Sequence, residues 1–295
     1  SKDRLKKNEI ESLGLDRLNY SVQQLRYIPK HLYSTQEKQL HLGYVLYADF
    51  SYNILETLPG TEFLYWLSEC KVLKLAENRL KTLPEEISQL ASIELFELNN
   101  NYISTVPHTL TLLTKLQRID MSTNHITTLP ESFGNLKLLK YIKIHSNYLE
   151  TLPQSIGECS KLQYIDISHN KCTELPESMQ YLISLTHLDI SDNRITAFPY
   201  HIGDCLNISY INASINKIAC LPPSFSQLTK LEYCDLVNND IVLSPNCFNQ
   251  LTSCKYLNMH TNAAKLLHAD IGNMRNLTML DLSCNVIISL PLEIG

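Results

Sequence analysis

Aromatic side chains recur at a fixed interval of 23 residues through the middle of the chain. The members of this series are Tyr141, Tyr164, His187, Tyr210, Tyr233 and Tyr256, and Tyr47 and Met279 occupy the same position further out. A tyrosine ring buries a large apolar area, while its hydroxyl group can still form a hydrogen bond. A regular series of rings therefore favours molecular recognition over catalysis.

A second series, of carboxylate and amide side chains, follows the rings at a distance of two residues. It comprises Asp120, Asp166, Asp189, Asn212, Asp235, Asn258 and Asp281, and it is interrupted by Lys74 and Lys143. Residues two apart lie on one face of a strand, and parallel strands are about 4.8 Å apart, so the six rings would span about 24 Å. We expect a basic or amphipathic segment of a protein partner to bind Tyr141, Tyr164, His187, Tyr210, Tyr233, Tyr256, Asp120, Asp166, Asp189 and Asp235.

These two series also have a purely structural interpretation. The aspartates can order the strands and keep the surface soluble, and the tyrosines can cover the edge of the core. In that case the partner would bind a lateral or terminal surface instead.

The residues that could support metal binding or catalysis are scattered. His145, His169, His187 and His260 fall on different repeats, without the close spacing of metal ligands. The chain contains no glycine-rich phosphate loop, no G-x-S-x-G and no H-E-x-x-H motif. A cysteine nucleophile with a histidine base is not excluded by sequence alone. We expect no enzyme activity, no metal and no cofactor.

The elements that must position these side chains are set by a repeated asparagine. It occurs at residues 53, 78, 101, 124, 147, 170, 193, 216, 239, 262 and 285, so the first interval is 25 residues and the next nine are 23. Apolar residues stand five and three positions before it, as Ile165 and Ile167 do before Asn170. This alternation predicts a short strand with one buried face in every repeat.

The asparagine and a following proline explain how the repeats would stack. A buried asparagine amide can bond to backbone groups of its own coil and of the neighbouring coil. Proline stands six residues later in ten of the repeats, with His268 as the exception, and it prevents a long helix from starting early. A single coil is too small to bury its apolar edge, so its stability must come from its neighbours.

The domain organisation follows from the same template. Residues 15–29 form an irregular first coil with Gln23 in the asparagine position, and about seven residues are inserted around 34–41. We expect about twelve coils in one domain, residues 15–295, with the last coil truncated and residues 1–14 forming an N-terminal cap. The coils of Asn239 and Asn262 depart from the pattern at Ser244 and His268. This irregularity indicates sequence drift, which we favour, or a kink or a notch for a partner.

The nine cysteines fit a reducing compartment, since six of them replace apolar core residues of the repeat. These six are Cys70, Cys159, Cys172, Cys205, Cys234 and Cys254, whereas Cys220, Cys247 and Cys284 are expected at the surface. The net charge of −5 argues against a nucleic-acid partner, and no apolar run is long enough for membrane insertion. The N-terminal residues do not resemble a secretory signal, so we expect a cytoplasmic location.

The pattern L-x-x-L-x-L-x-x-N-x-I-x-x-L-P-x-x-I-G-x-L-x-x-L resembles the leucine-rich-repeat superfamily. The 23-residue period and the stretches LPQSIG at 152–157 and FPYHIG at 198–203 look like the Ras-group type of intracellular scaffold proteins. The resemblance implies a right-handed α/β solenoid with a parallel sheet on its concave side. It also implies partner binding, without naming the partner.

We therefore expect a non-catalytic scaffold or recognition module that binds a protein on the concave face. Two alternatives remain open from the sequence. The chain could be the targeting module of a larger signalling enzyme, or a bacterial effector that acts in the cytosol of host cells.

Overall fold

The computed structural model describes residues 16–33 and 45–294, so the expected cap at 1–14 and the insertion at 34–41 lie outside the described residues. The chain divides into two compact units, residues 1–143 and residues 144–295. The assignment of residues 15–295 to a single domain remains a prediction.

The first unit contains six strands, one α-helix and four 3₁₀ helices among its described residues. The strands are β1 (Arg17–Asn19), β2 (Tyr47–Asp49), β3 (Val72–Lys74), β4 (Leu95–Glu97), β5 (Arg118–Asp120) and β6 (Tyr141–Lys143). The helices are η1 (Lys30–Leu32), α3 (Thr61–Trp66), η2 (Glu85–Gln89), η3 (His108–Leu112) and η4 (Glu131–Asn135). Each strand pairs in parallel with the next strand along the chain.

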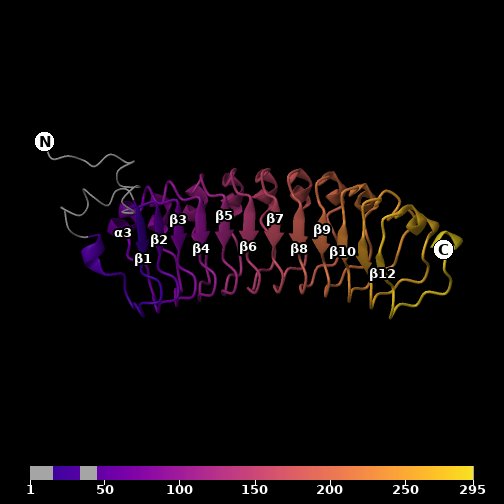
Figure 1. Ribbon diagram of the computed structural model, residues 1–295, viewed down its shortest axis with the longest axis horizontal. Helices are drawn as coiled ribbons and strands as arrows, with labels where there is room; N and C mark the ends of the chain where they lie inside the picture. Colours follow the sequence, from indigo (N-terminus) through magenta and orange to yellow (C-terminus); the bar gives the residue numbers. More distant parts are fainter. Residues whose placement is uncertain (1–15, 34–44, 295) are drawn as a thin grey trace. The chain divides into compact units, whose positions relative to one another are not determined.

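The second unit repeats this plan with six strands and six 3₁₀ helices among its described residues. The strands are β7 (Tyr164–Asp166), β8 (His187–Asp189), β9 (Tyr210–Asn212), β10 (Tyr233–Asp235), β11 (Tyr256–Asn258) and β12 (Met279–Asp281). The 3₁₀ helices are η5 (Gln154–Glu158), η6 (Glu177–Tyr181), η7 (Ile202–Asp204), η8 (Pro223–Gln227), η9 (Ala269–Asn273) and η10 (Leu292–Ile294). Its strands also pair in parallel and in chain order (Figure 1).

The predicted apolar positions of the repeat form the core. Ile165 and Ile167, five and three residues before Asn170, are fully buried, and so are their counterparts Leu188 and Ile190 in the next coil. Backbone bonds join one coil to the next, as when the Ile190 N–H donates to the carbonyl of Asn212 at 2.8 Å. The twelve strands correspond to the twelve expected coils, and the α/β solenoid prediction is confirmed.

The repeated asparagine forms the expected ladder. Asn193 accepts a bond from the Cys172 N–H of the preceding coil at 2.9 Å. Its side-chain Nδ2 donates to the carbonyls of Ile167 in that coil (2.9 Å) and of Ile190 in its own coil (3.2 Å). One amide thereby satisfies backbone groups in two coils, which would otherwise be buried without partners.

The residue before each asparagine adopts a left-handed backbone conformation, with φ of 52° at His169 and 49° at Asp192. The same holds for Tyr52, Glu77, Asn100, Thr123, Ser146, Ile215, Asn238, Thr261 and Cys284. A residue other than glycine is disfavoured there by about 1–2 kcal/mol. The ladder bonds on either side therefore have to hold the turn in place.

The LPxxIG segment lies in the part of each coil that connects one strand to the next. Pro153 precedes η5 with a φ of −66°, and its carbonyl accepts the Ile156 N–H at 3.0 Å to start the 3₁₀ turn. A Cβ atom at Gly157 would collide with the backbone carbonyl of Ser178 in the next coil. Gly157 therefore permits the close approach of the next coil at this point.

Candidate functional site

A continuous stack of five aromatic rings runs along the strands of the second unit. The centroid of Tyr164 lies 5.7 Å from that of His187, which lies 5.4 Å from that of Tyr210. Tyr210 and Tyr233 follow at 4.6 Å, and Tyr233 and Tyr256 at 4.4 Å. Each inner ring is thus covered by a neighbour on both faces. Stacking on both faces restricts the rotation of the inner rings.

The sixth predicted ring, Tyr141, lies in the first unit at the start of β6. The guanidinium carbon of Arg118 lies 4.2 Å from its ring centroid, which is a close cation–π contact. Arg17 approaches Tyr47 in the same way at 5.5 Å. The contact between Arg118 and this ring is not among the sequence-based expectations. Arg118 stands 23 residues before Tyr141, in the position that the rings occupy in other coils, and this spacing indicates that the two side chains are neighbours.

The predicted aspartates have two functions, one for each carboxylate oxygen. Asp166 Oδ1 accepts bonds from the N–H and the hydroxyl group of Ser168, at 3.1 and 2.7 Å, and Asp189 Oδ1 does the same with Ser191 at 3.0 and 2.6 Å. Asp120 in the first unit makes the equivalent pair of bonds to Ser122. One oxygen therefore orders the end of the strand, as the structural alternative supposes.

The second carboxylate oxygen lies on the side of the strands that carries the rings. We name this side of the strands the strand face. Asp189 Oδ2 accepts a bond from Asn212 Nδ2 at 3.1 Å, and Asp235 Oδ2 accepts one from the Tyr233 hydroxyl at 3.3 Å. Asn212 extends this network, and it belongs to the predicted amide series. Asp189 and Asp235 therefore lie on the same face of the strands as the rings of the second unit.

The carboxylates affect the titration of the rings beside them. Burial, followed by the charges of Asp189 and Asp235, raises the pKa of Tyr210 to about 12. Burial and the charge of Asp235 also raise the pKa of Tyr233. Both phenols are protonated at neutral pH, and the Tyr233 hydroxyl donates its proton to Asp235 Oδ2 on the strand face.

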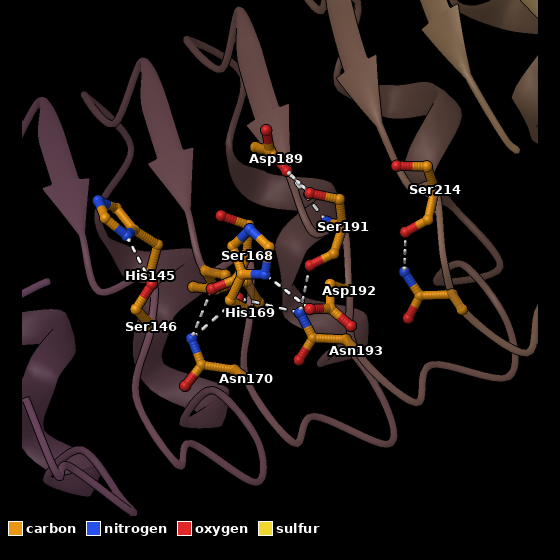
Figure 2. A network of polar contacts seen from close by, with 12 residues as sticks. His145, Ser146, Ser168, His169, Asn170, Asp189, Ser191, Asp192, Asn193 and Ser214 are labelled. Atoms are coloured by element: carbon orange, nitrogen blue, oxygen red, sulfur yellow. Dashed lines mark hydrogen bonds and ion pairs between the residues drawn. The ribbon is translucent and has the colours of Figure 1, made fainter. Parts of the chain in front are cut away.

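Histidines at the ends of the strands make local pairs (Figure 2). His169 Nδ1 lies 2.6 Å from Asp192 Oδ2, whereas His145 Nδ1 lies 3.1 Å from the Ser146 hydroxyl group. The Asp192 carboxylate therefore orients the His169 imidazole. Ser146 occupies the position of Asp192 two coils earlier, and it pairs with His145 of its own coil. Within residues 16–33 and 45–294, no group of three or more His, Cys, Asp or Glu side chains could hold a metal ion.

All nine cysteines lie in the described residues as free thiols, and seven of them are buried. The six predicted core cysteines are among these seven, and burial raises the pKa of Cys70 and Cys172 to about 12. The prediction that Cys247 lies at the surface is wrong, because this side chain is only 3% exposed. Its coil exposes Ser244 and Pro245 and turns Cys247 and Phe248 inward.

Comparisons with known proteins agree with this architecture. A family model described as leucine rich repeat matches residues 68–126, 95–149, 127–171 and 137–195. With these matches and the twelve coils, the chain belongs to the leucine-rich-repeat superfamily. In the described part of the chain, no helix combines the length and the apolar character needed to cross a membrane.

Three solved structures illustrate the similarity. A leucine-rich-repeat protein of Leptospira interrogans is 25% identical, with a TM-score of 0.66, and the match covers 98% of this chain and 84% of that protein. A TDR receptor is 25% identical with a TM-score of 0.80, and the match covers 91% of this chain but only 47% of the receptor. An internalin of Listeria monocytogenes shares the fold at 20% identity and a TM-score of 0.66, over 97% of this chain and 85% of the internalin.

Proposed function

We propose that the chain is a non-catalytic interaction module that binds a basic or amphipathic segment of a protein partner on its strand face. The observation that carries this proposal is the five-ring stack next to carboxylates on β7, β8 and β10. Preordered aromatic side chains lose little entropy on binding. Within the first unit, we propose the same role for Tyr141 and Asp120.

The charge of the strand face favours a cationic partner. Asp166, Asp189 and Asp235 each use Oδ1 to hold a backbone N–H, so their carboxylates are fixed in position before a partner arrives. A fixed carboxylate suits a guanidinium or ammonium group. The receptor similarity supports recognition of another protein as the general task.

We also propose a cytoplasmic location and a scaffold role of the Ras-group type. Seven buried free thiols fit a reducing compartment, where disulfides are rare. The 23-residue repeat with its LPxxIG segment is the feature that links the chain to this group.

The proposal is tested by affinity capture from cell lysate with three baits. The first is the wild-type chain, and the second carries Tyr210→Ala, Tyr233→Ala, Asp166→Asn and Asp189→Asn. Asparagine is the matched replacement, because Asn212 already holds the Ser214 N–H at this position, at 3.2 Å. The third bait carries Tyr181→Ala, which removes a 61% exposed ring on η6.

We expect a partner that is captured by the wild type and by Tyr181→Ala but is lost from the strand-face variant. Circular dichroism must show that all three baits are folded. Equal capture by all three would refute the strand face as the binding surface. A partner that is itself acidic would refute the proposed cationic segment.

A further inference from the structure

One coil of the second unit lacks a side chain that its neighbours share. The residue five after the asparagine is apolar and at most 7% exposed in the other coils described between residues 144 and 267. These residues are Leu152, Leu175, Phe198, Leu221 and Leu267. The coil of Asn239 has the exposed Ser244 there, and Leu243, one residue earlier, is buried at 7% instead. The buried leucine is therefore shifted by one residue, and the position five after the asparagine carries a small hydroxyl side chain instead of an apolar one.

A hollow of about 470 Å³ opens at this position. Phe198, Leu221 and Cys247 lie among the apolar residues that line it, together with Ser244 and Pro245 of the slipped coil. Sites that bind ligands have volumes of roughly 300–1,000 Å³. The hollow lies on the proline segments of the coils and does not include the rings of the strand face.

The next coil holds the slipped segment in place. In a regular coil the N–H of the residue nine after the asparagine donates to the proline carbonyl, as Phe225 does to Pro222 at 2.9 Å. In the slipped coil the Phe248 N–H donates instead to Asp270 Oδ2, at 2.9 Å. His268, which replaces the usual proline, places Nε2 3.4 Å from the Leu243 carbonyl. Asp270 and His268 both depart from the repeat pattern, and their contacts stabilise the irregular segment of the preceding coil.

The rim of the hollow carries a fixed negative charge. Both carboxylate oxygens of the exposed Glu177 accept the Tyr200 N–H, at 3.2 and 3.0 Å. Glu177 and Tyr200 both line the hollow. The side chain is therefore anchored without being neutralised, and it favours a cation beside the apolar floor.

We infer that this hollow is a second docking site, which takes a leucine side chain from a partner segment whose next residue is lysine or arginine. The leucine would fill the position that leucine occupies in the neighbouring coils, and the cation would face Glu177. This site is separate from the strand face, so the inference does not depend on the proposed function.

Cys220 provides a native reporter, since it lines the hollow and is exposed. Three dipeptide amides, Leu-Lys, Ala-Lys and Leu-Glu, are each given an N-terminal mercaptoacyl group and supplied as mixed disulfides with cysteamine. Exchange joins the probe to the thiol and releases cysteamine, and peptide mass spectrometry measures the occupancy of Cys220. Cys284, the other exposed thiol, is the internal control.

We expect Cys220 to capture Leu-Lys about tenfold more than Ala-Lys, because burial of the extra methylene groups is favourable. Cys284 should show no such preference. Leu-Lys should also exceed Leu-Glu at Cys220, and Glu177→Gln should remove that charge preference while it keeps the leucine preference. Equal capture of Leu-Lys and Ala-Lys at Cys220 would overturn the apolar site, and an unchanged charge preference in Glu177→Gln would overturn the role of the carboxylate.

Ser244→Leu restores the repeat residue and should fill the hollow. We expect this variant to lose the leucine preference at Cys220 while its circular dichroism and the reactivity of Cys284 stay unchanged. An independent measurement on the wild type uses N-acetyl-Leu-Lys-amide, which has no thiol, as a competitor. Capture of the Leu-Lys probe must fall as the competitor is added, and capture that does not respond would contradict a docking site.

Discussion

The buried asparagine is the residue on which each coil depends. Asn193 satisfies the Cys172 N–H and the Ile167 carbonyl of the preceding coil and carbonyls of its own coil. Each backbone group left buried without a partner costs about 1–3 kcal/mol. The side chain therefore matters more for the stability of the fold than for recognition.

Asn193→Leu should lower the free energy of unfolding by roughly 3 kcal/mol or more, since several backbone groups lose their partner at once. Urea unfolding followed by circular dichroism measures the change. Asn249→Leu is the matched control, because Asn249 is exposed and makes a side-chain contact to Asn273. A similar loss in both variants would show that the ladder is not the cause.

Tyr210 makes the ring stack sensitive to alkaline pH. Its pKa is about 12 in the folded chain, above the ordinary value of about 10 in an unfolded chain. Its neutral form therefore contributes stability that is fully present below about pH 10 and is lost as the pH rises toward 12. The urea midpoint of the wild type should fall over this range more than that of Tyr210→Phe, and parallel pH profiles would contradict the raised pKa.

At the scale of elements, the slipped coil and its successor form one cooperative pair. Asp270 is only 8% exposed, and it replaces the proline carbonyl as the acceptor for the Phe248 N–H. A buried N–H without an acceptor is costly. The bond from Phe248 to Asp270 therefore links the stability of the two irregular coils.

Asp270→Ala should reduce the free energy of unfolding by about 1–3 kcal/mol, because the Phe248 N–H loses its acceptor. Asp270→Asn keeps an acceptor oxygen and should lose less. Amide hydrogen exchange at Phe248 gives the local measurement, with faster exchange expected in Asp270→Ala. If the two variants exchange at the same rate, the bond is not what protects this amide.

At the scale of the whole chain, burial divides the nine thiols into two classes. Burial raises the pKa of Cys205 to about 12, with a further contribution from the charge of Asp204, so little thiolate forms there at pH 8. Cys220 and Cys284 are exposed. A thiol reagent such as DTNB should label two cysteines rapidly in the native protein and all nine after unfolding. Rapid labelling of a third thiol would contradict the burial of Cys247.

The sequence predicts the fold to the extent that each feature depends on short, fixed spacing. The apolar pair before each asparagine and the amide ladder follow from one 23-residue template. The left-handed residue before the asparagine does not, because Tyr52, Glu77 and Ile215 share no side-chain property. The backbone bonds on either side impose that conformation.

Features that depend on two coils together were harder to predict. The burial of Cys247 requires the slip at Leu243, and the slip is stabilised by Asp270 of the following coil. The ring and carboxylate series were visible in the sequence, and the structure shows one oxygen of Asp189 already in use within its own strand end. Their role in partner binding remains a prediction, since a surface does not specify its occupant.

The bonds from coil to coil also determine how the chain should respond to force. In each unit they lie along the stacking direction, as between Leu98 and Asp120 or between Ile190 and Asn212, both at 2.8 Å. Tension along that direction loads one row of bonds at a time, so coils should peel from an end rather than shear together. Single-molecule pulling should then show extension steps of about 75–80 Å, the length of one extended 23-residue repeat. A module of this kind would yield gradually under load and act as a molecular spring, whereas a single abrupt rupture of a whole unit would exclude such behaviour.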